Sequence, residues 1–281
     1  AFTAQIIINH VEARDDEVID NMDQALDRAV ANGVKNLVVQ PTHLMHGAEY
    51  DEMVETIDNY KDKFESVAIA EPMLGEVGDD ATVINDDKKA VAQAITDEAC
   101  KVAGYDSMEA AAEDGTAFVF MGHGTSHTAN VTYDQMQTQM GDLGFTNAFI
   151  GTVEGEPEDT ACEEVIAKVK DAGFKKVILR PLMVVAGDHA NNDMAGDDED
   201  SWKSQFEASG AFDSVDCQIE GLGRVAAVED LYVAHTKDAI DSLGTADDAA
   251  EVTDDTEEAS DDAAAEETTD DAADTTEEAA E

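Results

Sequence analysis

A ten-residue pattern that occurs twice constrains the fold more than any other feature of this sequence. The segment 32–41, NGVKNLVVQP, returns 140 positions later as the segment 172–181, AGFKKVILRP. Each copy follows apolar residues at helical spacing and contains an apolar run that ends at proline, which is typical of a buried strand in a βαβ unit. The chain is therefore expected to contain two copies of one α/β unit.

Strand and helix patterns alternate along the chain, which predicts parallel β-sheets flanked by helices. Residues 1–9 read as a strand running into a helix, and the other expected strands cover 34–40, 66–70, 117–121, 146–150, 175–180 and 214–220. The expected helices cover 16–32, 50–64, 86–102, 133–142, 158–171, 201–208 and 225–242. We expect an N-terminal α/β half at 1–105, a C-terminal α/β half at 106–244 that carries the functional site, and a disordered acidic tail at 245–281.

The repeat leaves one strand of the N-terminal half without a counterpart. Strand 117–121 precedes the C-terminal copy, but its equivalent in the N-terminal half would lie ahead of residue 1. We therefore expect the first strand of the N-terminal domain to be missing, which would leave a free sheet edge.

The net charge of −50 restricts the partners of the chain. Residues 245–281 hold 17 acidic and no basic side chains, and the rest of the chain still carries a net charge of −33. Nucleic acid and anionic membranes need Lys and Arg to bind their phosphates, so neither is expected as a partner. No apolar run approaches the roughly 20 residues that span a bilayer. We expect a cytoplasmic protein, and the incomplete N-terminal half leaves export open.

Cysteine chemistry is not indicated. The three cysteines, Cys100, Cys162 and Cys217, lie far apart and form no CxxC pair. Neither a disulfide framework nor a cysteine–metal site is therefore expected.

Two histidines and a carboxylate follow three of the expected strands. His123 lies in the run FVFMGHGTSH, His189 in LRPLMVVAGDHANNDM and Glu154 in AFIGTVEG. In an open α/β sheet, ligands bind outside the carboxyl ends of the strands. These three side chains are therefore candidates for one shared site.

Five segments around these positions resemble a known family. They span roughly positions 36 to 235 and read VQPTHLMHGAEY, MGHGTSHTAN, GTVEGEPE, LMVVAGDHANNDMAGDDEDSW and GLGRVAAVEDLYVAH. In this order they resemble the class II tetrapyrrole chelatases, specifically the anaerobic cobaltochelatases that insert cobalt into sirohydrochlorin in cobalamin biosynthesis. The resemblance implies two pseudosymmetric domains with an active-site cleft between them. It also implies insertion without ATP, and no phosphate-binding GxxxxGK[ST] loop is present.

The resemblance assigns roles to the three candidate residues. His123 and His189 match the family's two active-site histidines and Glu154 its glutamate, so all three are expected to hold the metal. Imidazole and carboxylate bind Co(II), Ni(II) and Fe(II), and three protein ligands leave coordination positions open. His123 is the expected catalytic base for the pyrrole protons, because neutral imidazole can take a proton near pH 7.

Further residues are candidates for binding the tetrapyrrole. Gly122, Gly124 and Gly187 would let the backbone approach a flat ligand closely. Arg180 is a candidate donor for the ligand's carboxylates. Asp188 is a candidate for orienting one of the histidines.

The N-terminal half contains a loop that corresponds to the His189 loop. At the repeat shift, Glu49 falls on His189. His43 and His46 lie in this loop and are candidates for the opposite wall of the cleft. His127 either faces the cleft or begins a helix.

Several functions remain open at this stage. The His/His/Glu set does not choose among metals, so a chelatase for iron or nickel on the same substrate is an alternative to the cobaltochelatase. A non-catalytic carrier of tetrapyrrole or metal is another. A metal-dependent hydrolase is disfavoured because no HExxH motif is present. The expected partners are sirohydrochlorin and the substrate metal Co(II), with no further cofactor, and the oligomeric state, including a homo-oligomer, is left open.

Overall fold

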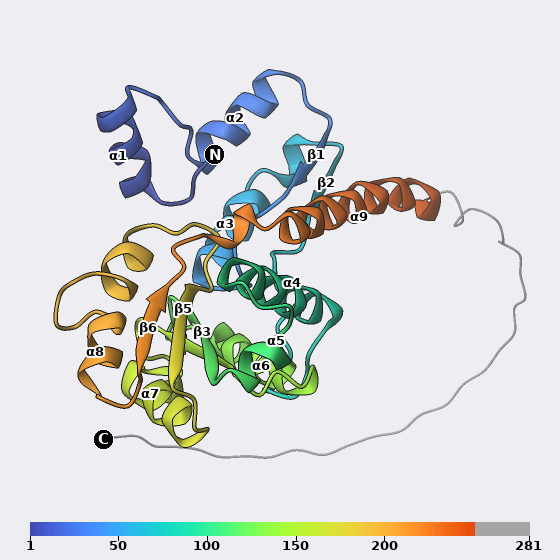
Figure 1. The fold of residues 1–281 in the computed structure, drawn as a ribbon. Helices are drawn as coiled ribbons and strands as arrows, with labels where there is room; N and C mark the ends of the chain where they lie inside the picture. Colours follow the sequence, from blue (N-terminus) through green and yellow to red (C-terminus); the bar gives the residue numbers. More distant parts are fainter. Residues whose placement is uncertain (251–281) are drawn as a thin grey trace, which may run out of the picture.

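Two parallel sheets lie in separate halves of the molecule in the computed structural model, which describes residues 1–250 (Figure 1). The N-terminal sheet pairs β1 (Asn36–Val39) with β2 (Ser66–Ile69). The C-terminal sheet has the strand order β4-β3-β5-β6, built from β3 (Thr116–Gly122), β4 (Ala148–Thr152), β5 (Lys176–Pro181) and β6 (Ser214–Cys217). All of these strand pairs are parallel, so the predicted α/β fold in two halves is confirmed.

The C-terminal sheet is covered by helices on both faces. Phe118 and Phe120 of β3 enter one core with α4 (Asp86–Ala103) and α6 (Val131–Asp142). The intervening residue Val119 enters a second core, which includes side chains of α7 (Cys162–Asp171) and α8 (Trp202–Ala208). Side chains alternate between the two faces of a strand, which explains why these strands read as continuous apolar runs.

The N-terminal half has its own smaller core. It is formed by α2 (Met22–Ala31) and α3 (Ala48–Asp58) against the sheet, with the buried residues Leu26, Met53, Ile57, Tyr60 and Phe64. Asn21 and Gln24 begin α2 with a reciprocal capping box, each side chain accepting the backbone N–H of the other residue.

The first element is a helix, α1 (Gln5–Asp15), whereas a strand running into a helix was expected over residues 1–9. The strand part of this expectation was wrong because the run Ile6–Ile8 has no neighbouring strand to pair with, and its backbone hydrogen bonds are made within the helix instead. Only Ile8 of this helix is buried.

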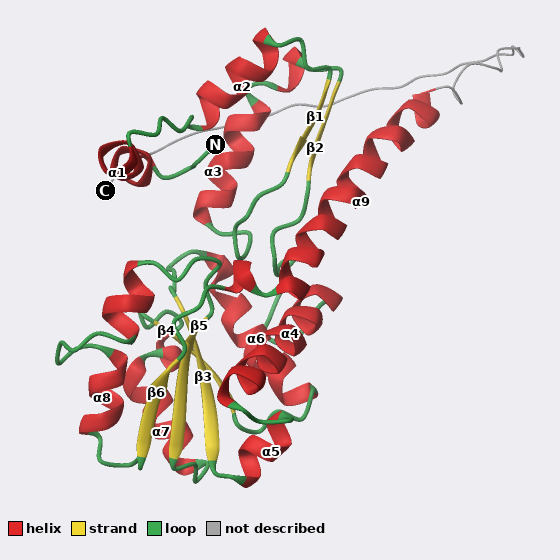
Figure 2. Cartoon of the chain, turned by 45° about the horizontal axis from the view of Figure 1, so that its top comes forward, coloured by secondary structure: helices red, strands yellow, loops and turns green. Residues whose placement is uncertain are grey.

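The two halves exchange helices. The last helix, α9 (Ala226–Ala250), follows β6 of the C-terminal sheet but packs on β1 and β2 of the N-terminal sheet (Figure 2). In return α4, which follows β2, packs on α6 of the C-terminal half. The expected boundary at residue 105 therefore separates α4 from the core in which it is buried.

Other departures from the predicted elements are local. The connection 106–114 contains α5 (Met108–Glu113), and the polar loop 186–200 contains a π-helix, His189–Met194. The helix predicted to end at 242 continues to Ala250, where the sequence is rich in alanine, a strong helix former. Short 3₁₀ turns occur at Lys61–Lys63, Thr128–Asn130, Glu158–Thr160 and Leu222–Arg224.

Neither edge of the N-terminal sheet carries a further strand within the described part of the chain. Among residues 1–250, β1 and β2 pair only with each other. A second cavity of about 460 Å³, lined by β1, α2 and residues 1–4, borders this half of the molecule.

Through residue 250, every helix is too short or too polar to cross a membrane. The expected disorder of the acidic tail concerns residues that, from 251 onward, lie outside the described part of the chain.

Candidate active site

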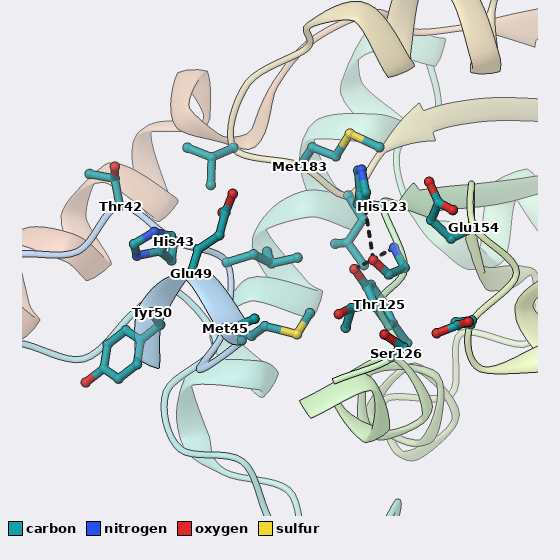
Figure 3. A pocket seen from close by; sticks show the side chains of 18 residues that line it. Thr42, His43, Met45, Glu49, Tyr50, His123, Thr125, Ser126, Glu154 and Met183 are labelled. Atoms are coloured by element: carbon teal, nitrogen blue, oxygen red, sulfur yellow. Dashed lines mark hydrogen bonds between the residues drawn. The ribbon is translucent and has the colours of Figure 1, made fainter. Parts of the chain in front are cut away.

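A cavity of about 640 Å³ lies between the two halves and contains the predicted residues His123, Gly124 and Glu154 (Figure 3). One wall is formed by the loop after β1 and the start of α3, over residues 42–50. The opposite wall is formed by the loops that follow β3, β4 and β5. The cleft expected between the halves is therefore present at the carboxyl ends of these strands.

The turn after β3 holds His123 in a fixed position because two glycines surround it. A Cβ atom on Gly122 would come within 2.4 Å of the Tyr133 ring, and Gly124 has a φ of +92°, a conformation that only glycine adopts without strain. The Gly124 N–H donates to the Tyr133 hydroxyl oxygen at 3.1 Å. Burial raises the pKa of Tyr133, so this hydroxyl stays neutral.

The ring nitrogens of His123 have different roles. Nδ1 lies 2.9 Å from the backbone carbonyl oxygen of Gly124. A carbonyl can only accept, so Nδ1 carries the proton and Nε2 carries the lone pair. His123 therefore presents an unprotonated nitrogen that can bind a metal or accept a proton.

His189 lies beside His123 although the two residues follow different strands. It begins the π-helix, and its ring centroid is 4.5 Å from that of His123, with the rings nearly perpendicular at 83°. Its Nδ1 is 2.5 Å from Asp193 Oδ2, so this histidine also has an oxygen acceptor at Nδ1. The structure thus brings the two predicted histidines together.

Glu154 completes the predicted set on the same wall. Its backbone N–H donates to the His123 carbonyl oxygen at 2.9 Å, and its side chain lines the same cavity as His123 (Figure 3). Nowhere in residues 1–250 are three His, Cys, Asp or Glu side chains grouped so that they could hold a metal ion together. Simultaneous ligation by His123, His189 and Glu154 therefore stays a prediction.

The N-terminal half contributes residues that the sequence reasoning did not select. Glu49, at the start of α3, and Tyr50 line the cavity opposite His123, and the repeat register that places Glu49 on His189 was a signal for this position. His43 lines the same wall, as expected. Burial lowers the pKa of His43, so its ring is neutral at pH 7.

Arg180, the expected donor to the substrate, lies away from the cavity. Its side chain is fully buried, and its Nη1 and Nη2 donate to Gln218 at 2.7 Å and to Glu220 at 3.2 Å. The guanidinium connects β5 to the segment after β6, and this geometry gives no support to a substrate contact.

Three further candidates, Gly122, Gly187 and Asp188, make their contacts with residues other than the two histidine rings. Gly122 packs against the Tyr133 ring, and neither it nor Gly187 lines the cavity. The Gly187 carbonyl oxygen accepts from Asn191. Asp188 does not orient a histidine, because its carboxylate accepts from Asn192 Nδ2 at 2.6 Å.

Two further histidines have structural partners outside the cavity. His46 Nε2 lies 2.7 Å from Glu71, and this contact lowers the pKa of the Glu71 carboxyl. His127 begins the 3₁₀ turn by accepting the Ala129 N–H, and its Nε2 lies 3.2 Å from Asp51 of the other half. His127 was expected either to face the cleft or to begin a helix, and this geometry fits the second expectation.

The cysteines are poor metal ligands in this fold. Burial raises the pKa of the Cys100 and Cys217 thiols to about 11 and that of Cys162 to about 12. The thiolate is the metal-binding form, so these residues stay protonated at neutral pH.

Comparisons with known proteins agree with this architecture. The sirohydrochlorin cobaltochelatase of Salmonella typhimurium is 33% identical over 241 residues, covering 86% of this chain and 82% of the relative. The sirohydrochlorin cobaltochelatase CbiKC of Nitratidesulfovibrio vulgaris is 28% identical over 247 residues, covering 86% and 78%. Among solved structures, SirB from Bacillus subtilis with Fe3+ shares the fold with a TM-score of 0.55 at 13% identity, covering 87% of this chain and 94% of that chain.

The family match covers almost all of the described chain. The family model described as Cobalt chelatase (CbiK) matches residues 1–241, which include both halves, the paired histidines and most of α9. On this match, the chain belongs to the cobalt chelatase (CbiK) family.

Proposed function

We propose that this chain inserts Co(II) into sirohydrochlorin without ATP, using the cavity between its two halves as the active site. The observation that carries the proposal is the pair of imidazoles, 4.5 Å apart, each with Nδ1 bonded to an oxygen acceptor. His123 lines the cavity, and His189 lies directly behind this lining with its ring against that of His123, so the two rings offer two Nε2 lone pairs at the edge of the cavity. Homology to two sirohydrochlorin cobaltochelatases over most of the chain supports the substrate and the metal.

Metal capture is the task of the paired histidines and the nearby carboxylate. Neutral imidazole is a good ligand for Co(II), and it exchanges more readily than a thiolate. Glu154 lies beside His123 and joins the metal after a rotation of its side chain. With so few protein ligands, positions on the ion remain free for the pyrrole nitrogens.

Proton removal follows from the same geometry. Insertion of Co(II) displaces two pyrrole N–H protons, which need an acceptor close to the ring. A nitrogen lone pair cannot hold the metal and a proton at once, so His123 Nε2 becomes available as a base when the ion passes to the macrocycle. His123 therefore acts first as a ligand and then as the acceptor of one of the two protons, while the second passes to water at the mouth of the cavity.

The charge of the cavity favours the cation. Glu49, Glu154 and Glu156 line it, and Lys and Arg are absent from the described residues of its lining. A cavity lined by one sign of charge raises the local concentration of the opposite ion. The carboxylates of sirohydrochlorin are then best placed at the mouth of the cavity, with the macrocycle between the methionine and leucine side chains Leu44, Met45, Leu182 and Met183.

The test is an anaerobic absorbance assay. Sirohydrochlorin is mixed with catalytic amounts of protein and with Co(II), Ni(II) or Fe(II), and initial rates above the protein-free rate are compared. We expect the highest kcat/KM with Co(II). Preference for iron or nickel would overturn the metal assignment, and binding of sirohydrochlorin at one equivalent without turnover would identify a carrier.

A further inference from the structure

The two histidines of the site are oriented by different kinds of acceptor. His123 Nδ1 faces a backbone carbonyl oxygen, that of Gly124, at 2.9 Å. His189 Nδ1 faces a carboxylate, that of Asp193, at 2.5 Å. The second contact depends on a side chain and can therefore be removed by substitution.

We propose that Asp193 is the positioning residue of the site, which fixes the tautomer and the direction of the His189 ring. An ionised carboxylate is only an acceptor, so the proton of a neutral His189 ring stays on Nδ1 and its lone pair stays on Nε2. Carboxylate partners of this kind also make the imidazole a stronger donor toward a metal. The role in metal capture rests on the proposed function, whereas the tautomer follows from the contact alone.

The π-helix places Asp193 for this task. The two residues are four positions apart, at the first and fifth positions of the π-helix. Ala190 and Met194 of the same helix are fully buried and fix it to the body of the protein. Asp193 itself is half-exposed and contributes little to the core, so its removal is expected to leave the helix in place.

Because their Nδ1 acceptors differ, the two histidines bind the metal with different strength. A carboxylate at Nδ1 makes the imidazole a stronger electron donor toward a metal than a neutral carbonyl does. His189 is then the stronger ligand, which retains Co(II) in the site. His123 is the weaker ligand, which releases the ion first.

The experiment compares Asp193→Asn with Asp188→Asn. Both remove one carboxylate next to His189, but only Asp193 contacts the ring, and Asn at 188 can still accept from Asn192. The first readout is the ring-nitrogen NMR spectrum of the metal-free protein labelled with ¹⁵N-histidine, with His189 assigned by its loss in His189→Gln. We expect the Nδ1–H tautomer in the wild type and in Asp188→Asn, and a mixture with the Nε2–H tautomer in Asp193→Asn.

The second readout is Co(II) affinity, measured by titration of the visible absorption of the ion without tetrapyrrole. Loss of such a partner weakens metal binding about 10–100-fold. We expect this loss in Asp193→Asn, together with a similar rise in the KM for Co(II) and a smaller fall in kcat at saturating Co(II). Asp193→Glu keeps a carboxylate and is expected to recover part of the affinity.

The outcomes separate this inference from the proposed function. An unchanged His189 tautomer in Asp193→Asn, in a protein with wild-type circular dichroism, would overturn the positioning role. Should Asp193→Asn not fold, a wild-type His189 ring found in the Nε2–H form would overturn it equally. Co(II) affinity that is unchanged in His189→Gln would contradict the proposed metal site, while the tautomer would still decide the role of Asp193.

Discussion

At the scale of single residues, the site depends on which nitrogen of each histidine carries a proton. The acceptors at Nδ1 of His123 and His189 are a carbonyl and a carboxylate, and neither can donate. Both rings, when neutral, therefore offer Nε2 without any change of tautomer when the metal arrives. Two imidazoles that need no change of tautomer bind a metal more tightly than two that do.

The two histidines are expected to differ on substitution. His123→Ala should remove turnover even when excess Co(II) restores occupancy, because the proton acceptor is lost. His189→Ala should mainly raise the KM for Co(II), and high Co(II) should partly restore the rate. Insertion rates over a range of Co(II) concentrations check both, and near wild-type turnover in His123→Ala would remove the base assignment.

Gly124 and Gly187 form a second contrast. A Cβ on Gly124 would meet Glu154 Cβ at 2.9 Å and would sit on a backbone with positive φ, whereas a Cβ on Gly187 would have no atom within 4 Å. Gly124→Ala should lower the free energy of unfolding by about 1–3 kcal/mol, and Gly187→Ala should leave it nearly unchanged. Urea unfolding of the two variants measures this, and equal stabilities would contradict the strain argument.

The sequence was informative about residues whose position is set by strand ends. His123, His189 and Glu154 follow apolar runs, and such runs end at one sheet edge, so their proximity could be predicted. Asp193 could not be predicted as a partner of His189, because their contact depends on a π-helix that the sequence of the polar loop does not predict. The burial of Arg180 could not be predicted, because β5 is buried on both faces and its sequence does not show whether a charged residue pairs inside the fold or reaches the cavity.

At the scale of elements, α9 is hydrogen-bonded to the N-terminal wall of the cavity. Tyr232, His235 and Thr236 occupy one face of this helix. The Tyr232 hydroxyl donates to the His43 carbonyl oxygen at 3.1 Å, and Thr236 Oγ1 donates to Gln40 Oε1 at 2.7 Å. His235 lies 3.1 Å from the Glu71 carbonyl oxygen and 3.0 Å from Asp87. The helix thereby holds the loops that follow β1 and β2.

Tyr232→Phe tests this attachment. Burial raises the pKa of Tyr232 well above its usual value, so the hydroxyl stays a donor at all physiological pH values. Its removal should cost about 1 kcal/mol of stability and raise the KM for the tetrapyrrole, with the Co(II) affinity unchanged. Val233→Ala, at a position 67% exposed on the same helix, is the control and should match the wild type. A KM that stays the same in Tyr232→Phe would show that the wall does not depend on this bond.

Helix and strand positions in the C-terminal half followed from apolar periodicity, and apart from the end of α9, which lies eight residues beyond the predicted one, their ends lie within about four residues of the predicted ones. The periodicity did not show which sheet each helix covers. The apolar positions of α4 and α9 predict helices with one buried face each. That face could pack against either sheet, so the sequence pattern could not predict that α4 and α9 each pack on the opposite half. Residues 1–9 were misread for a related reason, since three consecutive isoleucines or valines fit a strand only when a partner strand is present.

At the scale of the whole molecule, the dominant property is negative charge. The chain carries 66 acidic against 16 basic residues, and several of the basic ones are held in local ion pairs such as Lys35–Glu65 and Lys176–Asp114. Mutual repulsion of the remaining carboxylates destabilises the compact state. The fold should therefore depend on the ionic strength of its surroundings.

Salt is expected to stabilise the protein. Raising KCl from about 0.1 M to about 1 M shortens the Debye length from about 10 Å to about 3 Å, and the Tm should rise steadily over this range. A chain ending at Ala250 should show the same trend, because most of the acidic residues lie before that point. A Tm that is independent of KCl in both chains would contradict this account, and NaCl in place of KCl controls for a specific cation effect.

The packing of α9 on the N-terminal sheet also limits the order in which the protein can fold during translation. The strands β1 and β2 leave the ribosome early, but the helix that covers them is the last element described, α9. During synthesis one face of the N-terminal sheet stays uncovered until the whole segment between β2 and α9 has emerged. Contacts between segments so distant along the chain slow the final assembly, so the nascent chain exposes apolar surface for most of its translation and is a natural client for chaperones that bind at the ribosomal exit.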